Sequence, residues 1–228
     1  MLSKEDHEKM QKYLRGEIFV SQNISQVTQE NIDKWFSTKQ GYYLQKRLSA
    51  SFLKKVHSWE NSTYFDKTQN SDNVQKRFLD GQIFENYVAG LEVTEHNQSL
   101  RILADKVVNI YPELRFGTTS QQSIFKGNVS GYKTKCKTDF ECKDTIYELK
   151  SSNAKTLRGY EINHLSFMYD MQAYIQNSLS DKEIIFVVAS KKNHKVWEYY
   201  PNYELGQKQF LECVSILRKY ELHKQFQV

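Results

Sequence analysis

The hydrophobic periodicity of the chain changes near Pro112, and this change limits the folds that the chain can adopt. After Pro112, Tyr132, Thr134 and Cys136 alternate with lysines, which predicts a strand over 132–139. Apolar residues at helical spacing predict helices over 28–36, 49–59, 74–91, 100–110, 165–179 and 203–226, with a short charged helix over 4–14. Further strands are predicted over 145–150, 183–189 and 194–200. Helices followed by strands with an inserted helix favour one α/β (α+β) domain.

The composition supports a compact protein without membrane segments. A chain of 228 residues with two prolines and nine glycines has room for a core but little for linkers. The longest apolar run, 184–189, is too short to span a bilayer, and the first residues lack an apolar signal core. Three cysteines cannot all pair. We therefore expect a soluble cytoplasmic protein with no membrane partner.

The positive charge is concentrated in one part of the sequence. The net charge is +5, and the segment 120–160 holds eight Lys or Arg against four Asp or Glu. A locally basic segment in a nearly neutral chain favours contact with a polyanion such as nucleic acid. Lysines that are simply solvated are the ordinary alternative.

The most specific motif is an aspartate followed by a Glu-x-Lys sequence. Glu148 and Lys150 are two apart in a predicted strand and so share a face, and Asp139 lies one turn upstream. Two carboxylates repel each other unless a cation lies between them, and oxygen ligands suit Mg²⁺ or Mn²⁺. A lysine beside them can orient a water or stabilise charge on phosphate. The alternative is an ordinary surface ladder of charged residues.

Two polar residues occupy positions on otherwise apolar helical stripes. Gln172 continues the stripe of the 165–179 segment, and Glu85 lies on the stripe of the 74–91 segment. A buried amide or carboxylate needs a partner, a ligand or a metal. The alternatives are a satisfied core amide for Gln172 and a salt bridge to Lys76 or Arg77 for Glu85.

Taken together, these residues resemble a known nuclease family. Asp139, Glu148-Leu149-Lys150 and the later Gln172 and Tyr174 are similar to the PD-(D/E)XK core, in its lambda exonuclease / exonuclease VIII branch (RecB-like, YqaJ-like). The segments 48–53, 81–85 and 169–174 match further motifs of that branch in the same order. The chain departs from the family pattern at Thr138, where proline is frequent. It also lacks the cysteine set of the iron–sulphur members and any Walker A motif.

The resemblance implies a restriction-endonuclease-like core, with a central mixed β-sheet flanked by helices, in a single domain over 1–228. Residues 1–45 would form an N-terminal helical extension, 46–200 the nuclease core and 201–228 a C-terminal helix. One or two Mg²⁺ or Mn²⁺ ions, and no iron–sulphur cluster, would be bound by Asp139, Glu148 and the Leu149 carbonyl, with Glu85 in support. The implied catalytic residues are Asp139, Glu148, Lys150 and Gln172. The implied DNA contacts are Ser49, Ser51, Lys133, Lys135, Lys137, Ser151, Lys155, Arg158 and Tyr174.

The implied activity is a metal-dependent DNA exonuclease acting on linear duplex DNA in recombination, repair or phage DNA metabolism. The implied partners are DNA, further copies of the chain in a ring, and a single-strand annealing protein. The implied location is the cytoplasm of a bacterium or a phage-infected host. Two alternatives stay open: a structure- or sequence-specific endonuclease of the same fold, and a catalytically silent nucleic-acid-binding module.

Overall fold

The computed structural model describes residues 26–37, 45–61, 71–93, 97–117, 120–166 and 168–228. The helix predicted over 4–14 lies outside these residues. Within them, no helix is both long enough and apolar enough to cross a membrane.

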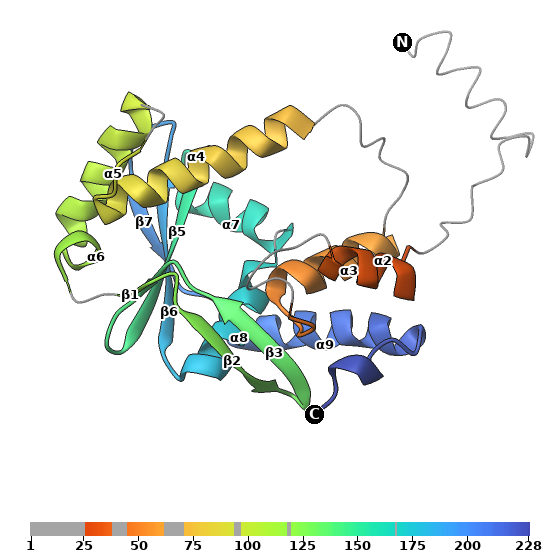
Figure 1. Cartoon of the computed structure of the whole chain (residues 1–228). Helices are drawn as coiled ribbons and strands as arrows, with labels where there is room; N and C mark the ends of the chain where they lie inside the picture. Colours follow the sequence, from red (N-terminus) through yellow and green to blue (C-terminus); the bar gives the residue numbers. More distant parts are fainter. Residues whose placement is uncertain (1–25, 38–44, 62–70, 94–96, 118–119, 167) are drawn as a thin grey trace, which may run out of the picture.

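The centre of the molecule is a five-stranded mixed sheet (Figure 1). Its strands in spatial order are β1 (Ser120–Gln121), β4 (Phe140–Glu141), β5 (Thr145–Ser152), β6 (Glu183–Ser190) and β7 (Val196–Tyr199). β5 and β6 run parallel, with Glu148 opposite Phe186, and the other pairings are antiparallel. A parallel pair needs a crossover, which here is helical. The predicted central mixed sheet is therefore confirmed.

Helices cover both faces of this sheet. α4 (Ser71–Ala89), α5 (Gln98–Ile110) and α6 (Glu113–Phe116) pack on the face that presents Leu149 and Val187. The crossover helices α7 (Leu157–Ser166) and α8 (Tyr169–Ser180) lie on the face that presents Ile146 and Phe186. Alternate residues of β5 thus face different helical layers, because side chains alternate along a strand.

A second group of elements packs against the far side of α8. It contains α2 (Gln29–Ser37), α3 (Ala50–Asn61), the hairpin of β2 (Ile124–Val129) and β3 (Tyr132–Lys137), α9 (Tyr203–Lys219) and the 3₁₀ turn η2 (Lys224–Phe226). Phe226 is fully buried against Phe36 and Phe52, so the end of the chain closes this core.

Two helix predictions were wrong at specific residues. The segment 165–179 is not one helix, because Met168 takes a left-handed conformation (φ 50°) between α7 and α8. The helix predicted over 203–226 ends at Lys219, and Glu221 is left-handed (φ 58°) before η2 begins. Neither break falls at a glycine or proline, so the sequence carried no ordinary stop signal.

The strand alternation around residue 135 was also partly wrong. Lys133 and Lys137 are exposed as predicted, but Lys135 is buried. The chain around Leu48 runs along β3, and Lys135 Nζ donates to the Gln45 carbonyl at 2.6 Å. Lys135 is therefore used inside the protein and is not available to a partner at the surface.

Candidate active site

The site begins on β5, where Glu148 and Lys150 point to the α8 side of the sheet. Their shared face follows from the two-residue repeat of a strand. Asp139 lies where the chain leaves β3 and enters β4, beside β5. Its Oδ2 accepts from the Leu149 main-chain N–H at 2.9 Å, and the Asp139 N–H donates to Glu148 Oε1 at 3.3 Å. The main chain thus fixes the two carboxylates relative to each other.

Lys150 joins these carboxylates. Its Nζ lies 3.0 Å from Glu148 Oε2 and 3.5 Å from Asp139 Oδ2, and the side chain of Glu148 is only 1% exposed. Burial by itself would lower the pKa of Lys150, but Glu148 and then Asp139 outweigh it and raise the pKa well above its ordinary value. The lysine is therefore a cation held between two carboxyl groups.

Two glutamines of α8 hold the same carboxylate. Gln172 Nε2 donates to Glu148 Oε2 at 2.6 Å, and Gln176 Nε2 donates to Glu148 Oε1 at 2.6 Å. Residues four apart in a helix share a face, so one helix grips both oxygens. Each oxygen of Glu148 thus accepts two hydrogen bonds, about the number that its lone pairs allow.

Gln176 is the residue that sequence reasoning missed. It is fully buried, it also donates to the Lys137 carbonyl at 3.1 Å, and its Oε1 has no hydrogen-bond partner in the described part of the chain. Gln172, in contrast, is only half-buried. A second glutamine one turn after Gln172 was the signal in the sequence.

Burial and the nearby charge of Asp139 make Glu148 and Glu85 hard to ionise. Burial first and Asp139 second raise the pKa of Glu148 to about 7, although Lys150 acts in the other direction. Glu85 belongs to α4, on the other face of the sheet. Its Oε2 accepts a hydrogen bond from Gln122 Nε2 at 3.3 Å. Burial and then Asp139 raise the pKa of Glu85 to about 8. A cation among these groups would relieve the repulsion.

The chemistry of these donors fits a hard divalent cation. Carboxylate and carbonyl oxygens are the ligands that Mg²⁺ and Mn²⁺ prefer. In the part of the chain that is described, no three His, Cys, Asp or Glu side chains are close enough as placed to hold a metal ion together. The Asp139 and Glu148 pair would therefore need a main-chain oxygen such as that of Leu149, together with water, to complete a ligand shell.

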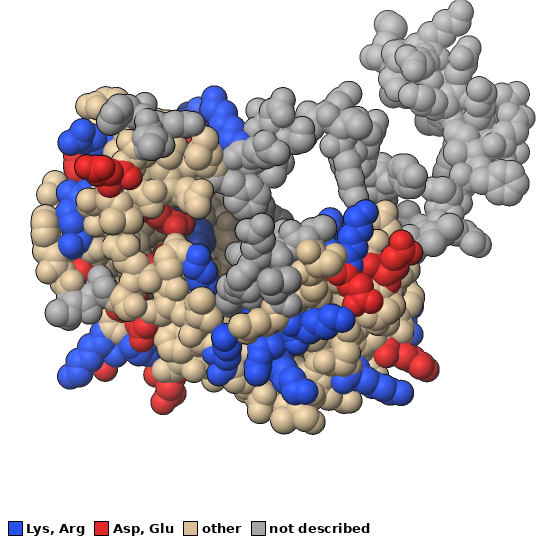
Figure 2. Space-filling model, in the orientation of Figure 1, with Lys and Arg blue, Asp and Glu red and all other residues tan. Residues whose placement is uncertain are grey.

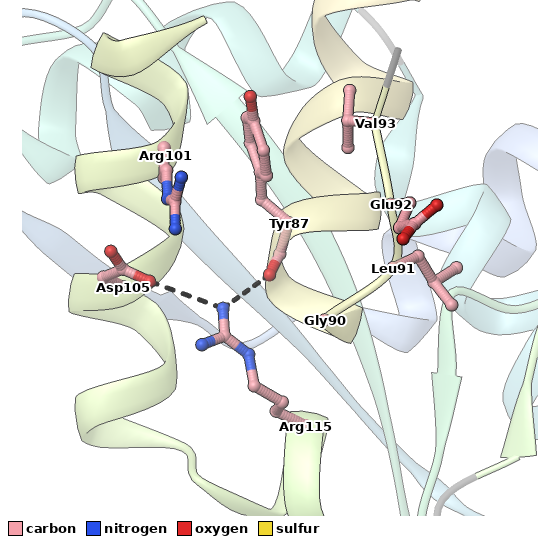
Figure 3. A pocket seen from close by; sticks show the side chains of 8 residues that line it. All are labelled: Tyr87, Gly90, Leu91, Glu92, Val93, Arg101, Asp105 and Arg115. Atoms are coloured by element: carbon pink, nitrogen blue, oxygen red, sulfur yellow. Dashed lines mark hydrogen bonds and ion pairs between the residues drawn. The ribbon is translucent and has the colours of Figure 1, made fainter. Parts of the chain in front are cut away.

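Two cavities lie near α4. The smaller, about 240 Å³, is lined by Glu85 and Asp139 together with Gln121 and Gln122. It therefore opens onto the acidic cluster, which consists of Glu85, Asp139 and Glu148. The larger, about 520 Å³, lies between α4, α5 and α6 (Figure 3). There Arg115 donates to the Tyr87 carbonyl at the end of α4 and pairs with Asp105, as Figure 3 shows. The larger cavity thus holds a helix-capping arginine rather than the acidic cluster.

The residues predicted to contact DNA differ in how exposed their side chains are. Ser49 caps α3 by accepting from the Phe52 N–H, its Oγ lies 3.2 Å from that of Ser51, and Ser51 is exposed. Lys137, Lys155 and Arg158 are exposed, and Ser151 is half-buried next to Lys150. Figure 2 shows basic side chains gathered over the β2–β3 hairpin, and acidic and basic side chains together in a recess of the same face.

Tyr174 does not join the acidic cluster. It lies on the side of α8 opposite Gln172, because residues two positions apart in a helix point about 200° away from each other. Its ring packs on Phe210 of α9, and its hydroxyl lies 3.1 Å from Ser130 Oγ. Its surroundings are those of a packing residue.

Comparison with solved structures bears on the fold. The chain is similar to a protein from Eubacterium rectale that is provisionally described as an exonuclease, with a TM-score of 0.53 and 16% identity, covering 86% of this chain and 88% of the other. The chain has an exonuclease-like fold. The predicted resemblance to exonucleases is thereby confirmed at the level of the fold.

Other comparisons are weaker. An alkaline exonuclease from Laribacter hongkongensis gives a TM-score of 0.37 at 13% identity, covering 83% of this chain and 92% of the other. A phage-related exonuclease from Haemophilus somnus 129PT gives 0.39 at 13% identity, covering 76% and 92%. No family model and no curated protein matches the sequence.

Proposed function

We propose that this chain is a divalent-metal-dependent nuclease that hydrolyses phosphodiester bonds of DNA from the ends of linear duplexes. The observation that supports it most is the cluster in which Lys150 Nζ lies 3.0 Å from Glu148 and 3.5 Å from Asp139. A buried and a half-buried carboxylate beside a lysine are suited to metal-assisted hydrolysis. The exonuclease-like fold supports the same reaction class.

In this proposal Asp139, Glu148 and the Leu149 carbonyl hold Mg²⁺ or Mn²⁺, with Glu85 on the other side of the site. When bound, such an ion lowers the pKa of a water and offsets the charge that develops on phosphate. Glu148 accepts four hydrogen bonds, so it can bind a further group only if one donor leaves. Lys150 has the most flexible of these donors.

Lys150 therefore has two positions in the proposed reaction. Without substrate its ammonium binds Glu148 and Asp139. With substrate it leaves Glu148 Oε2 and donates to the attacking water or to a phosphate oxygen, which orients the nucleophile. Gln172 and Gln176 keep Glu148 in place during this exchange, because both belong to the same rigid helix.

The exposed basic residues would bind the DNA backbone. Lys137, Lys155 and Arg158 carry charge without a rigid base-reading element, and such contacts position a duplex without selecting sequence. Ser51, exposed in the first turn of α3, is available for a phosphate. The ring assembly and the annealing partner implied by the resemblance remain predictions.

The test uses one DNA sequence in two forms, an end-labelled linear duplex and a covalently closed circle, each incubated with Mg²⁺. We expect the linear form to shorten from an end, the circle to stay intact, and EDTA to stop the reaction. Glu148→Gln should slow degradation by about a hundredfold. Cutting of the closed circle at a similar rate would favour an endonuclease, and no cutting of either form would overturn the nuclease proposal.

A further inference from the structure

A second lysine, from a different element, lies beside the acidic cluster. Lys54 belongs to α3, about one turn after Ser49 and Ser51. Its Nζ lies 4.6 Å from the centre of the Tyr169 ring, and Lys150 Nζ lies 5.5 Å from the same centre. The fold thus brings two lysines that are far apart in the sequence to one aromatic ring at the start of α8.

These two lysines differ in how their charge is compensated. Lys150 binds Glu148 and Asp139, as described above. Lys54 is half-buried, and within the described part of the chain its ammonium makes neither an ion pair nor a hydrogen bond. Burial and the charge of Lys150 lower the pKa of Lys54 to about 7, with Glu148 acting in the other direction. A half-buried ammonium without an anion is unfavourable.

The ring of Tyr169 does not remove this imbalance. A cation over an aromatic face gains some electrostatic attraction, but the N–H donors of Lys54 find no acceptor among the residues that the structure describes. An apolar side chain of similar length would pack on the ring without bringing charge close to Lys150. A lysine at this place is therefore better explained by an anion that binds there and keeps the ammonium charged.

We propose that Lys54 contacts a phosphate of the nucleic acid next to the one held at Lys150. This inference rests on the proposed function, and it adds a substrate contact from α3 to the reaction. An ammonium on a flexible stem binds single phosphate oxygens as a point charge, so Lys54 would contribute affinity without selecting sequence. Phosphodiester oxygens would supply the negative partner that Lys54 lacks among the described residues.

Lys55 offers a matched control. It has the same side chain and the same helix, but its Nζ lies 5.6 Å from the ring centre of Trp59, on another side of α3. The variants are Lys54→Met, which keeps the apolar stem, Lys54→Arg, which keeps the charge, and Lys55→Met. Binding of an internally labelled linear duplex is measured by fluorescence anisotropy without divalent metal, over a series of KCl concentrations, together with each melting temperature.

We expect Lys54→Met to weaken binding about tenfold at low salt and to reduce the slope of log Kd against log salt by about one. Lys54→Arg should stay within about twofold of the wild type, and Lys55→Met should match the wild type. The melting temperature of Lys54→Met should be no lower than that of the wild type, because a charge repelled by Lys150 is removed.

Three results would overturn the inference in distinguishable ways. Wild-type affinity and salt slope in Lys54→Met, with an active wild type, would remove the role of Lys54 and leave the proposed function standing. A lower melting temperature in Lys54→Met, with binding not restored in Lys54→Arg, would show that the lysine only supports the fold. A wild type that neither binds nor cuts DNA would overturn the proposed function, and with it the inference.

Discussion

At the scale of single residues, the acidic cluster is organised by hydrogen bonds to one carboxylate. Glu148 is nearly inaccessible, with donors from two glutamines, a lysine and a main-chain N–H. Outer contacts of this kind set the orientation of a metal-binding group and strengthen the site. The residue whose role was least visible from the sequence, Gln176, is therefore a suitable one to change.

Gln176→Met should lower Mg²⁺ affinity about tenfold, because Glu148 Oε1 loses its shortest donor while the side-chain volume is kept. The free energy of unfolding should fall by only about 1 kcal/mol. Isothermal titration calorimetry measures the first quantity and urea unfolding the second. Asn177→Leu is the control, since Asn177 donates to the Lys182 carbonyl, away from the cluster. Wild-type Mg²⁺ affinity in Gln176→Met would contradict the role.

Glu85 gives a prediction for pH. Burial and Asp139 raise its pKa from 4.5 to about 8, so the folded protein holds this proton more tightly than the unfolded chain does. Stability is therefore lost as pH rises from about 5 through 8, where the carboxylate is forced to ionise. In EDTA, Glu85→Gln should match the wild type near pH 5 and exceed its free energy of unfolding by about 1–2 kcal/mol at pH 8.5.

Urea unfolding at several pH values measures this difference, and Mg²⁺ should reduce it at high pH by stabilising the ionised wild type. A difference that stays the same from pH 5 to pH 8.5 would mean that Glu85 titrates normally in the fold.

At the scale of elements, the site depends on how closely α8 and α9 approach. Gly206 lies in the first turns of α9, and a Cβ there would overlap the Asp170 carbonyl oxygen and lie 2.8 Å from Tyr174 Cβ. The Asp170 side chain in turn accepts from the Asn202 N–H at 2.8 Å and from the Tyr199 hydroxyl at 3.1 Å. The close packing of α9 and these hydrogen bonds thus hold α8, the helix that presents Gln172 and Gln176.

Gly206→Ala should lower the free energy of unfolding by about 2–3 kcal/mol, because α8 and α9 must separate. The matched change is Gly81→Ala in α4, where a Cβ meets nothing within 4 Å. That change should raise the free energy of unfolding by about 0.5–1 kcal/mol through helix propensity. Urea unfolding compares the two, and a stabilising Gly206→Ala would contradict the close approach.

The sequence predicted some elements and site residues correctly and failed for others. Strong local patterns predicted β5, β6 and most helices, because burial repeats along those segments. The break at Met168 and the burial of Lys135 depend on partners far away in the sequence, such as the chain at Gln45. Asp139, Glu148 and Lys150 were predicted together because Glu148 and Lys150 share one face of a strand and Asp139 lies one turn upstream of it. Lys54 could be recognised only from tertiary packing, whereas the sequence signal for Gln176 was its place one turn after Gln172.

At the scale of the whole molecule, two cores meet at α8. One core lies between α8 and one face of the sheet, and the other joins α2, α3, α9 and the hairpin. The acidic cluster lies on the sheet side and the serines of α3 lie on the other, so a bound strand would contact both groups of elements. We propose above all that the cluster of Asp139, Glu148 and Lys150 hydrolyses phosphodiesters.

The most direct test of this claim is the single-turnover rate of end-labelled duplex degradation in Mg²⁺, for the wild type, Lys150→Ala and Lys143→Ala. Lys143 is an exposed lysine in the turn between β4 and β5 and serves as the control. We predict that Lys150→Ala, folded by circular dichroism, degrades DNA about a hundredfold more slowly or worse, while Lys143→Ala matches the wild type. Wild-type degradation by a folded Lys150→Ala would contradict the claim.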